Sequence, residues 1–422
     1  MSRPPSTVHD EVQSSEPLLD AERGRSTSVD GEGNSVRRTE FRSRSPVTVK
    51  NNRNRYALAA LMLVLSLGSF VLQTETAQYI QRDLGWNKAY CMMYLTHGSW
   101  AFLWPAQLLV LRIRKRQIPF KNLLRSHLSL LRSTIDMVLQ ADRSSHQQDI
   151  THPFYYLLRC IALVTTALTI AGSTWYIAVN LTTPSDLTAI YNCSAFFAYA
   201  FSIPLLREKP QADKIISVLI AVVGVLVVAY GDNTDKKEQD GGSSTRLGGN
   251  MLIGIGSVLY GLYEVLYKKL LCPPSGTSSG RSVIFSNTVC ACIGAFTLLI
   301  LWIPLPLLHW TGWETFEIPT GKTAQLLSIS IFANAVFSGS FLILISLTSP
   351  VLSSVAALLT IFLVAITDKI LFGRELTSAA IIGGLLIIAA FGLLSWATWK
   401  EMREESEKDV SDLTSDIEDH DD

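Results

Sequence analysis

Charge is scarce in this chain, and neither sign is in excess. Only 17% of the 422 residues are charged, and 36 Lys and Arg are balanced by 36 Asp and Glu. This balance gives no global argument for a nucleic-acid partner, and we expect none. The charges cluster at the chain ends and in short loops, so that long uncharged tracts lie between them. Many apolar tracts of this length exclude a soluble enzyme.

Motifs for catalysis and metal binding are also missing. The six cysteines lie mostly inside apolar tracts, and Cys290-x-Cys292 has no second pair of metal ligands near it. We therefore expect neither a zinc site nor a disulfide framework. The sequence contains no Ser/His/Asp cluster and no phosphate-binding glycine loop. We expect a protein that is not an enzyme, with no catalytic residue, no metal and no cofactor.

A signal peptide is not found in the first 55 residues, which are polar and rich in Ser, Arg and Glu. We expect residues 1–50 to form a disordered cytosolic tail and the first apolar tract to act as an uncleaved signal. The segment Glu16-Pro17-Leu18-Leu19 resembles an acidic dileucine sorting signal, although its acid is closer to the leucines than usual. Chance occurrence is the alternative.

Long apolar tracts are what the chain has in abundance. A membrane-spanning helix needs about 20 mainly apolar residues. We expect ten such helices, at 56–74, 90–111, 154–179, 187–206, 212–230, 249–267, 283–305, 323–347, 351–372 and 378–399. The predicted fold is an all-α polytopic membrane protein.

An internal repeat organises these tracts. Pro184 precedes Glu208 by 24 positions, and Pro350 precedes Glu375 by 25. We divide the chain into a first half of five helices (51–231), a hinge loop (232–248), a second half of five helices (249–400) and an acidic disordered tail (401–422). Because five is odd, the second half enters the membrane upside down. Inverted repeats of this kind are typical of transporters that work by alternating access.

The distribution of Lys and Arg indicates the orientation. Cytosolic loops carry an excess of these residues, which here places both termini in the cytosol. The loop 112–153 lies on the same side, and its apolar positions from Phe120 to Val138 recur at helical spacing. This helix either lies on the cytosolic leaflet or is a solvated linker.

Several segments resemble a known family. The segment from Asp186 to Phe197 resembles the fourth-span motif of solute carrier family 35, and Arg207-Glu208-Lys209 fits the same pattern. The plan of two EamA-type halves resembles the drug/metabolite transporter superfamily. Thr74-Glu75-Thr76-Ala77-Gln78 and Asn87-Lys88-Ala89-Tyr90 look like the F subfamily and its fungal relatives. The resemblance implies a transporter of an internal membrane, Golgi or vacuole-like, with the plasma membrane as the alternative. Thiamine-like and nucleotide-sugar substrates are both proposed for that subfamily.

Polar residues at membrane depth are costly and usually face the bundle interior, so they are candidates for the solute site. In the first half, Glu75 and Gln78 share a helix face, unless the span ends at Thr74 and leaves Glu75 solvated. His97 either relays protons or bonds a neighbouring backbone group. Asp186 is expected to cap its helix. The further candidates are Tyr94, Tyr191 and Asn192.

In the second half, Glu264 is the main candidate. It shares a helix face with Tyr260, Tyr263 and Tyr267, where it either binds a cation or pairs with Lys268. The single amides, Asn287 and Asn334, either contact the solute or bond between helices. Asp368-Lys369 is expected to be a structural pair.

We therefore predict a secondary active transporter of a small polar or organic solute. Its partners are that solute and membrane lipid. Coupling to a proton, exchange for a counter-substrate and assembly as a homodimer are all open. The alternative is a non-transporting sorting or receptor-like membrane protein that has kept a transporter fold.

Overall fold

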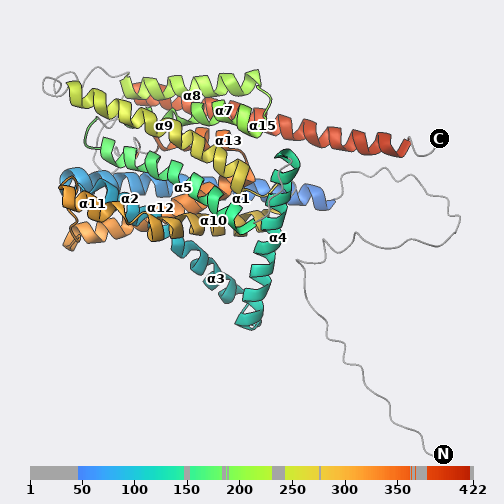
Figure 1. The fold of residues 1–422 in the computed structure, drawn as a ribbon. Helices are drawn as coiled ribbons and strands as arrows, with labels where there is room; N and C mark the ends of the chain where they lie inside the picture. The colour runs from blue at the N-terminus through green and yellow to red at the C-terminus, as the bar shows by residue number, and fades with distance from the viewer. Residues whose placement is uncertain are drawn as a thin grey trace, which may run out of the picture. The chain divides into compact units, whose positions relative to one another are not determined.

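The computed structural model describes residues 46–146, 153–182, 187, 190–230, 243–274, 277–361, 363, 366 and 378–418. These residues form helices joined by turns, and no strand occurs among them (Figure 1). Several sequence expectations fall outside this part of the chain: residues 1–45 with Glu16-Leu19, residues 231–242 of the hinge, Asp186, Asp368-Lys369 and residues 419–422.

The first half of the chain contains most of the short elements. They are α1 (Pro46–Gln78), η1 (Tyr79–Asp83), α2 (Ala89–Gly98), η2 (Ser99–Phe102), α3 (Leu103–Arg114), α4 (Phe120–His146), α5 (Pro153–Ala178), α7 (Ser194–Leu206) and α8 (Ala212–Tyr230). The sequence left open whether the first span ends at Thr74. The helix α1 runs to Gln78, so the span continues beyond Thr74 and includes Glu75.

The second half contains the longer helices. They are α9 (Ser243–Leu271), α10 (Ser279–Ile300), α11 (Pro304–Thr311), α12 (Gly321–Leu347), α13 (Pro350–Ala357) and α15 (Ser378–Glu418). Two differences from the sequence expectations concern segments that we expected to be disordered or flexible. Residues 243–248 of the hinge belong to α9, and the acidic tail continues α15 to Glu418. The tail begins with Glu, Met and Arg at 401–405, and these are strong helix formers.

Six described helices are long and apolar enough to cross a membrane. They are Arg55–Gln81, Phe154–Ala178, Leu247–Leu271, Ser279–Ile300, Gly321–Leu347 and Ile381–Lys400, and two shorter apolar helices are Ile190–Leu206 and Pro350–Ile361. The chain is thus a multi-pass, all-helical membrane protein. The ten-helix count and the inverted arrangement stay predictions.

The second apolar tract is not one continuous helix. A 3₁₀ turn, η2, separates α2 from α3. Pro105 lies in the first turn of α3, and a proline both lacks an amide hydrogen and clashes with the carbonyl four residues earlier, here that of Ala101. The break turns Trp100 inward, where it is 2% exposed.

The halves pack closely along several helix pairs. α5 and α7 both lie against α9, and α8 lies against α15 (Figure 1). At the last contact, Gly224 faces the carbonyl oxygen of Gly383, because a Cβ built on Gly224 would lie 2.9 Å from that atom. Small residues let membrane helices approach this closely.

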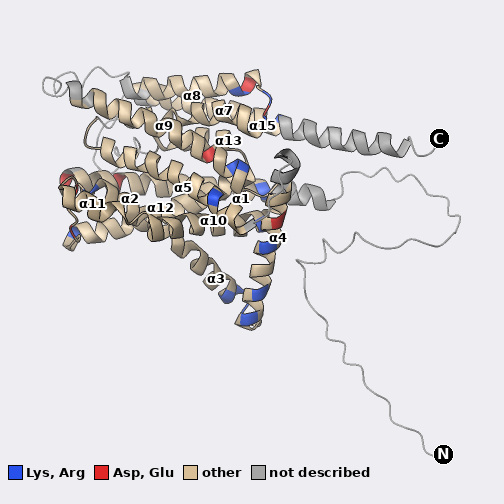
Figure 2. Ribbon diagram, in the orientation of Figure 1, with Lys and Arg blue, Asp and Glu red and all other residues tan. Residues whose placement is uncertain are grey.

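The two ends of the bundle differ in charge (Figure 2). We call the end where α1 begins and α9 finishes the basic end, since it carries Arg55, Arg207, Lys268 and Lys269. The opposite end, which we call the far end, holds Lys88, Glu314, Glu317 and Lys322. Between them lies a long stretch with few charges, as the sequence analysis expects.

Candidate functional site

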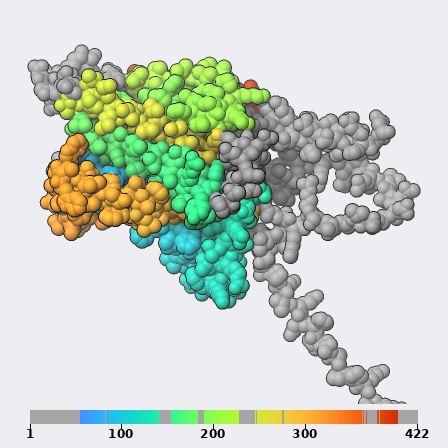
Figure 3. Space-filling view, viewed as in Figure 1, coloured from blue at the N-terminus to red at the C-terminus, as the bar shows by residue number. Residues whose placement is uncertain are grey.

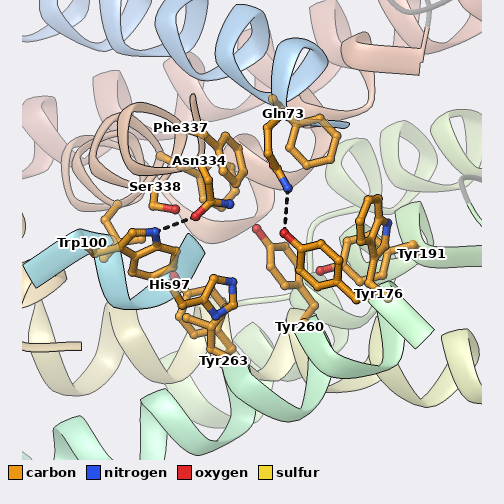
Figure 4. Close-up of a pocket in the computed structure, with 16 residues that line it drawn as sticks. Gln73, His97, Trp100, Tyr176, Tyr191, Tyr260, Tyr263, Asn334, Phe337 and Ser338 are labelled. Carbon is orange, nitrogen blue, oxygen red and sulfur yellow. Dashed lines mark hydrogen bonds between the residues drawn. The ribbon is translucent and has the colours of Figure 1, made fainter. Parts of the chain in front are cut away.

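A cavity of about 50 Å³ lies between helices of both halves, and we call it the central cavity (Figure 4). Its lining is mainly aromatic. The residues are Phe70, Gln73, His97, Trp100, Leu168, Gly172, Trp175, Tyr176, Tyr191, Tyr260, Tyr263, Asn334, Phe337, Ser338, Phe341 and Leu342. They come from α1, α2, η2, α5, α9 and α12, and Tyr191 comes from the helical turn before α7, so that both halves contribute.

One side of the cavity is organised by Trp100. Its indole Nε1 donates a hydrogen bond to Asn334 Oδ1 at 2.7 Å, which joins η2 to α12 (Figure 4). The His97 ring lies beside the same indole, with ring centroids 4.7 Å apart. Because the indole is a donor only, this bond fixes the amide oxygen of Asn334 toward Trp100.

The opposite side of the cavity is organised by Tyr176. Gln73 Nε2 donates to the Tyr176 hydroxyl at 3.3 Å (Figure 4), and that hydroxyl also lies 3.3 Å from Thr96 Oγ1. These contacts join α1, α2 and α5. All three side chains are buried.

Three polar atoms of the cavity have no hydrogen-bond partner among the described residues: Gln73 Oε1, His97 Nδ1 and Ser338 Oγ. Their residues are 5%, 6% and 2% exposed. Most buried polar atoms in proteins have a partner, and leaving one unpaired costs about 1–3 kcal/mol. Water molecules or a polar solute in the cavity would supply the missing donors and acceptors.

A run of aromatic rings completes the lining. Tyr191 lies 5.1 Å from Tyr260, and Tyr260 lies 5.5 Å from Tyr263, as ring centroid distances. Phe341 extends the run, with a near-parallel ring 6.4 Å from Tyr260. Such a surface suits a flat ring or an apolar body.

Glu264 is fully buried beside the cavity but does not line it. Its Oε2 accepts a hydrogen bond from Ser354 Oγ on α13, and its Oε1 has no partner. The expected alternative, a pair with Lys268, is wrong. Lys268 Nζ instead donates to the carbonyl oxygens of Ile345, Ser346 and Thr348 at 2.9–3.0 Å. Those carbonyls end α12 and have no partner within the helix, so they attract the ammonium.

A cleft of about 1010 Å³ opens at the basic end, and we call it the basic-end cleft. Along α9, the cavity is lined by Tyr260 and Tyr263, and the cleft by Lys268 and Lys269 farther along the helix. Along α12, the cavity lining ends at Leu342 and the cleft lining begins at Leu344. The cleft has the size of a small-molecule site, whereas the cavity has room for a few water molecules.

The far end is held by contacts between the halves. Glu314 accepts hydrogen bonds from the backbone N–H groups of Tyr90 and Cys91, both at 2.8 Å. These amides lie in the first turn of α2, where helix amides lack internal partners and a negative charge is favourable. Lys88 Nζ donates to Thr315 Oγ1 at 2.6 Å, and Lys322 Nζ donates to the Tyr79 hydroxyl at 2.8 Å.

Part of the chain is similar to known transporters. Residues 87–230 match the model of the EamA-like transporter family. The chain is 28% identical over 221 residues to an uncharacterized transporter of Schizosaccharomyces pombe, covering 52% of this chain and 62% of that protein. It is 25% identical over 231 residues to solute carrier family 35 member F3 of Homo sapiens, covering 53% and 50%. These matches confirm the resemblance to the drug/metabolite transporter superfamily.

Two further proteins are similar to this chain in sequence or in fold. An uncharacterized vacuolar membrane protein of Saccharomyces cerevisiae is 26% identical over 249 residues, covering 55% of this chain and 61% of that protein. A solved crystal structure superposes with a TM-score of 0.52 at 12% identity, covering 82% of this chain and 98% of that one, which shows similarity of the fold alone. The chain spans between a half and two thirds of the length of the relatives named here.

Five of the eleven candidate site residues line the central cavity. These are His97, Tyr191, Tyr260, Tyr263 and Asn334. Whether they contact a solute stays a prediction. For Asn334, the bond to Trp100 also bears out the interhelical alternative.

Six candidates lie elsewhere. The Tyr94 hydroxyl donates to the Leu298 carbonyl oxygen at 3.1 Å, and Asn287 Nδ2 donates to the Leu103 carbonyl oxygen at 3.1 Å. Both side chains therefore join helices. Glu75, Gln78 and Asn192 are partly buried and do not line the cavity, and Glu264 lies beside it. Glu75 differs from Gln73 by two residues, which places it on nearly the opposite side of α1.

Sequence reasoning missed several lining residues. Gln73 is an amide within an apolar tract, the same signal that identified Asn287 and Asn334, and it could have been found by that signal. Trp100, Trp175 and Tyr176 gave no such signal, because aromatic residues are equally common where helices face lipid.

Proposed function

We propose that this protein is a secondary active transporter that moves a small polar or organic solute across a membrane by alternating access. The observation that carries the proposal is the central cavity, where Gln73, His97 and Ser338 hold unpaired polar atoms among aromatic rings. The resemblance to the drug/metabolite transporter superfamily supports it, as do relatives that are named transporters. An enzyme is not proposed.

The unequal ends of the bundle support alternating access. At the basic end, the cleft is large enough for a metabolite. At the far end, Glu314, Lys88 and Lys322 join the two halves. A transporter of this kind exposes its site to one side at a time. We propose that the described state is open toward the basic end and that the far-end contacts break when the site faces the other side.

The packing of the helices supports the inverted repeat that we propose. In such a repeat, each helix of the first half has a counterpart five spans later in the second half. Two helices that pack together should then have counterparts that also pack together. The contact of α2 with α5 has its counterpart in that of α10 with α12. The close contact of α5 with α9 has a much looser counterpart, in which α1 meets α12 only through side chains, in the cluster of Ala59, Ile343 and Leu344 and in the ring pair of Phe70 and Phe337. α8 packs against its own counterpart, α15.

The chemistry of the cavity restricts the solute to molecules that combine a ring or apolar body with hydrogen-bonding groups. Nucleotide-sugar-like, thiamine-like and other metabolites all meet this description. A thermal-unfolding screen of the purified full chain against nucleotide sugars, nucleotides, thiamine and related cations, amino acids and organic acids tests it. A ligand at 100 times its Kd stabilises the folded state by about 2.7 kcal/mol. We expect one chemical class to stabilise the protein, and Asn334→Leu to abolish that effect. Stabilisation that Asn334→Leu leaves intact would place the site elsewhere.

Alternating access is tested at the far end. Replacing Glu314 with Gln removes the charge that accepts from the amides of Tyr90 and Cys91, and a hydrogen bond to a charged group is worth about 1.5–3 kcal/mol. Cys91 is 3% exposed, so its thiol serves as a native reporter. We expect Glu314→Gln to raise the rate of maleimide labelling at Cys91 about tenfold. Peptide mass spectrometry measures the labelling over time.

Glu317→Gln is the matched control. Its carboxylate is 69% exposed and lies 3.7 Å from Lys88 Nζ, and an exposed ion pair contributes about 0–1 kcal/mol. We expect little change in Cys91 labelling. Equal labelling in wild type and both variants would contradict the role of the far-end contacts.

The second candidate function is a non-transporting sorting or receptor-like protein. The small volume of the cavity, about 50 Å³, favours it, because metabolite sites are usually several times larger. Reconstituted vesicles separate the two functions. A compound that stabilises the protein and also crosses the vesicle membrane supports transport, whereas one that binds without crossing supports a receptor.

We further propose an internal membrane as the location. A relative is named as a vacuolar membrane protein, which supports a vacuole-like compartment over the plasma membrane. Proton coupling, exchange for a counter-substrate and a homodimer are compatible with this proposal. Fluorescence microscopy of the tagged full chain tests the location, and label at the cell surface would contradict it.

A further inference from the structure

The turn between α3 and α4 is unusually basic. We call residues 112–132 the α3–α4 elbow. It carries seven cations: Arg112, Arg114, Lys115, Arg116, Lys121, Arg125 and Arg132. No Asp or Glu occurs between Leu84 and Ile135. Arg114, Lys115, Arg116 and Lys121 are exposed, and none of the four has an ion-pair partner among the described residues.

Apolar side chains are exposed between these cations. Ile113 is 52% exposed, Phe120 51% and Leu128 48%. A surface that alternates large apolar groups with Lys and Arg is typical of segments that lie in a membrane interface. The apolar groups enter the acyl boundary, and the cations remain among the headgroups.

The position of α4 fits such an interface. The spans of the bundle run roughly parallel, whereas α4 runs across their direction at the basic end (Figures 1 and 2). The elbow itself projects from the surface of the bundle (Figure 3). Since spans lie close to the membrane normal, α4 lies close to the membrane plane.

The inner face of α4 is fixed to the bundle and so cannot turn away from the membrane. Leu123, Leu131 and Val138 are buried, and Arg281 Nη2 donates to Ser133 Oγ at 3.1 Å. Trp104 Nε1 donates to His127 Nε2 at 3.2 Å. Partial burial lowers the pKa of His127, which keeps this acceptor neutral.

We propose that the α3–α4 elbow is a binding surface for the headgroups of anionic phospholipids. The seven cations supply the complementary charge, and Ile113, Phe120 and Leu128 supply the apolar anchor. Each basic residue near an anionic leaflet strengthens binding about fivefold. The elbow thereby holds the N-terminal end of α4, which projects from the bundle, at a membrane leaflet. This is the leaflet on the side of the basic-end cleft.

The full-length protein is reconstituted in vesicles of equal phosphatidylcholine and phosphatidylserine, and the lipids that stay bound after detergent extraction are counted by mass spectrometry. We expect enrichment in phosphatidylserine, and Lys115→Gln/Lys121→Gln should lower the affinity of the protein for this lipid about 25-fold. Raising the salt concentration should weaken the retention in wild type.

The matched control removes two exposed lysines from the same end, as Lys209→Gln/Lys400→Gln. We expect it to keep the enrichment. Equal loss in both double variants, or no enrichment in wild type, would overturn the proposal and leave α4 a solvated linker. Complete displacement of the lipid by inorganic phosphate would also overturn it, because the surface would then take a free anion.

Discussion

Buried polar atoms without partners lower stability unless a ligand pairs with them. Ser338 is one of these in the central cavity, and its hydroxyl has no partner although the residue is 2% exposed. Such a group lowers the stability of the folded protein. Groups of this kind are common at functional sites, where activity is gained at the expense of stability. The same reasoning applies to Gln73 Oε1 and His97 Nδ1.

We therefore expect Ser338→Ala to raise the free energy of unfolding of the ligand-free protein by about 1 kcal/mol. A ligand found in the screen should then stabilise the variant less than the wild type. Ser328→Ala on the same helix is the control, because Ser328 is exposed and its hydroxyl already donates to the Ala324 carbonyl oxygen. Chemical or thermal unfolding in detergent measures both. Destabilisation by Ser338→Ala would show that the hydroxyl has a structural role.

Glu264 offers a second test at the residue scale. Its carboxyl group is wholly buried, accepts from Ser354 and has a second oxygen without a partner. Gln keeps an acceptor for Ser354 but cannot gain or lose a proton, so the packing should survive. We expect Glu264→Gln to lower transport about tenfold, or 1.4 kcal/mol, while the amount in the membrane is unchanged.

Glu75→Gln is the comparison for Glu264→Gln. Glu75 is partly buried and lies off the cavity, so its loss should reduce transport less. Vesicle uptake and quantitative blotting measure transport and abundance. Normal uptake in both variants would exclude the two carboxylates from the solute path.

At the scale of helices, the length of the apolar tracts predicted most of the helices but not the places where a helix is interrupted. The tract at 90–111 reads as one span, yet it is divided at η2 because Pro105 removes a backbone donor. The tracts at 187–206 and 351–372 contain the shorter helices Ile190–Leu206 and Pro350–Ile361. The amphipathic period from Phe120 to Val138 correctly predicted a helix, α4. Its face against α9 and α10 could not be predicted, because it depends on partners distant in sequence.

The contact of α8 with α15 provides a test at this scale. Gly→Ala in a helix usually adds about 0.5–1 kcal/mol of stability. At Gly224, however, the new methyl group would lie 2.9 Å from the Gly383 carbonyl oxygen and 2.9 Å from Ile387 Cγ1. We expect Gly224→Ala to destabilise by about 1–3 kcal/mol, because overpacking costs this much.

Gly392→Ala is the matched control on α15. No atom lies within 4 Å of a Cβ built at Gly392, so this substitution should leave stability unchanged or raise it slightly. The midpoints of thermal unfolding in detergent compare the two variants. A stable Gly224→Ala protein would show that the two helices separate easily.

At the scale of the whole molecule, local sequence patterns predicted the fold class better than the site. Apolar tracts report membrane helices directly, since each tract is continuous in the chain. The central cavity instead combines Gln73, His97, Tyr176, Tyr260 and Asn334, which lie on five different helices. Their meeting depends on helix rotation, which the position of a polar residue in a tract does not determine. Glu75 and Gln73 illustrate this, because a shift of two residues moves a side chain across α1.

The distribution of charge also predicts how the molecule is oriented in the membrane. The basic end combines the α3–α4 elbow with Arg55, Arg207, Lys209, Lys268 and Lys269, whereas Lys88 at the far end lies near Glu317. Since cytosolic loops retain Lys and Arg, we expect reporters fused before Met1 and after Asp422 to face the cytosol. A reporter inserted within 232–242, between α8 and α9, should face the opposite side, because an odd number of predicted spans precedes it. Protease protection of the three fusions in sealed vesicles measures their sides. Three reporters on one side would contradict five spans in the first half, and with them the inverted repeat.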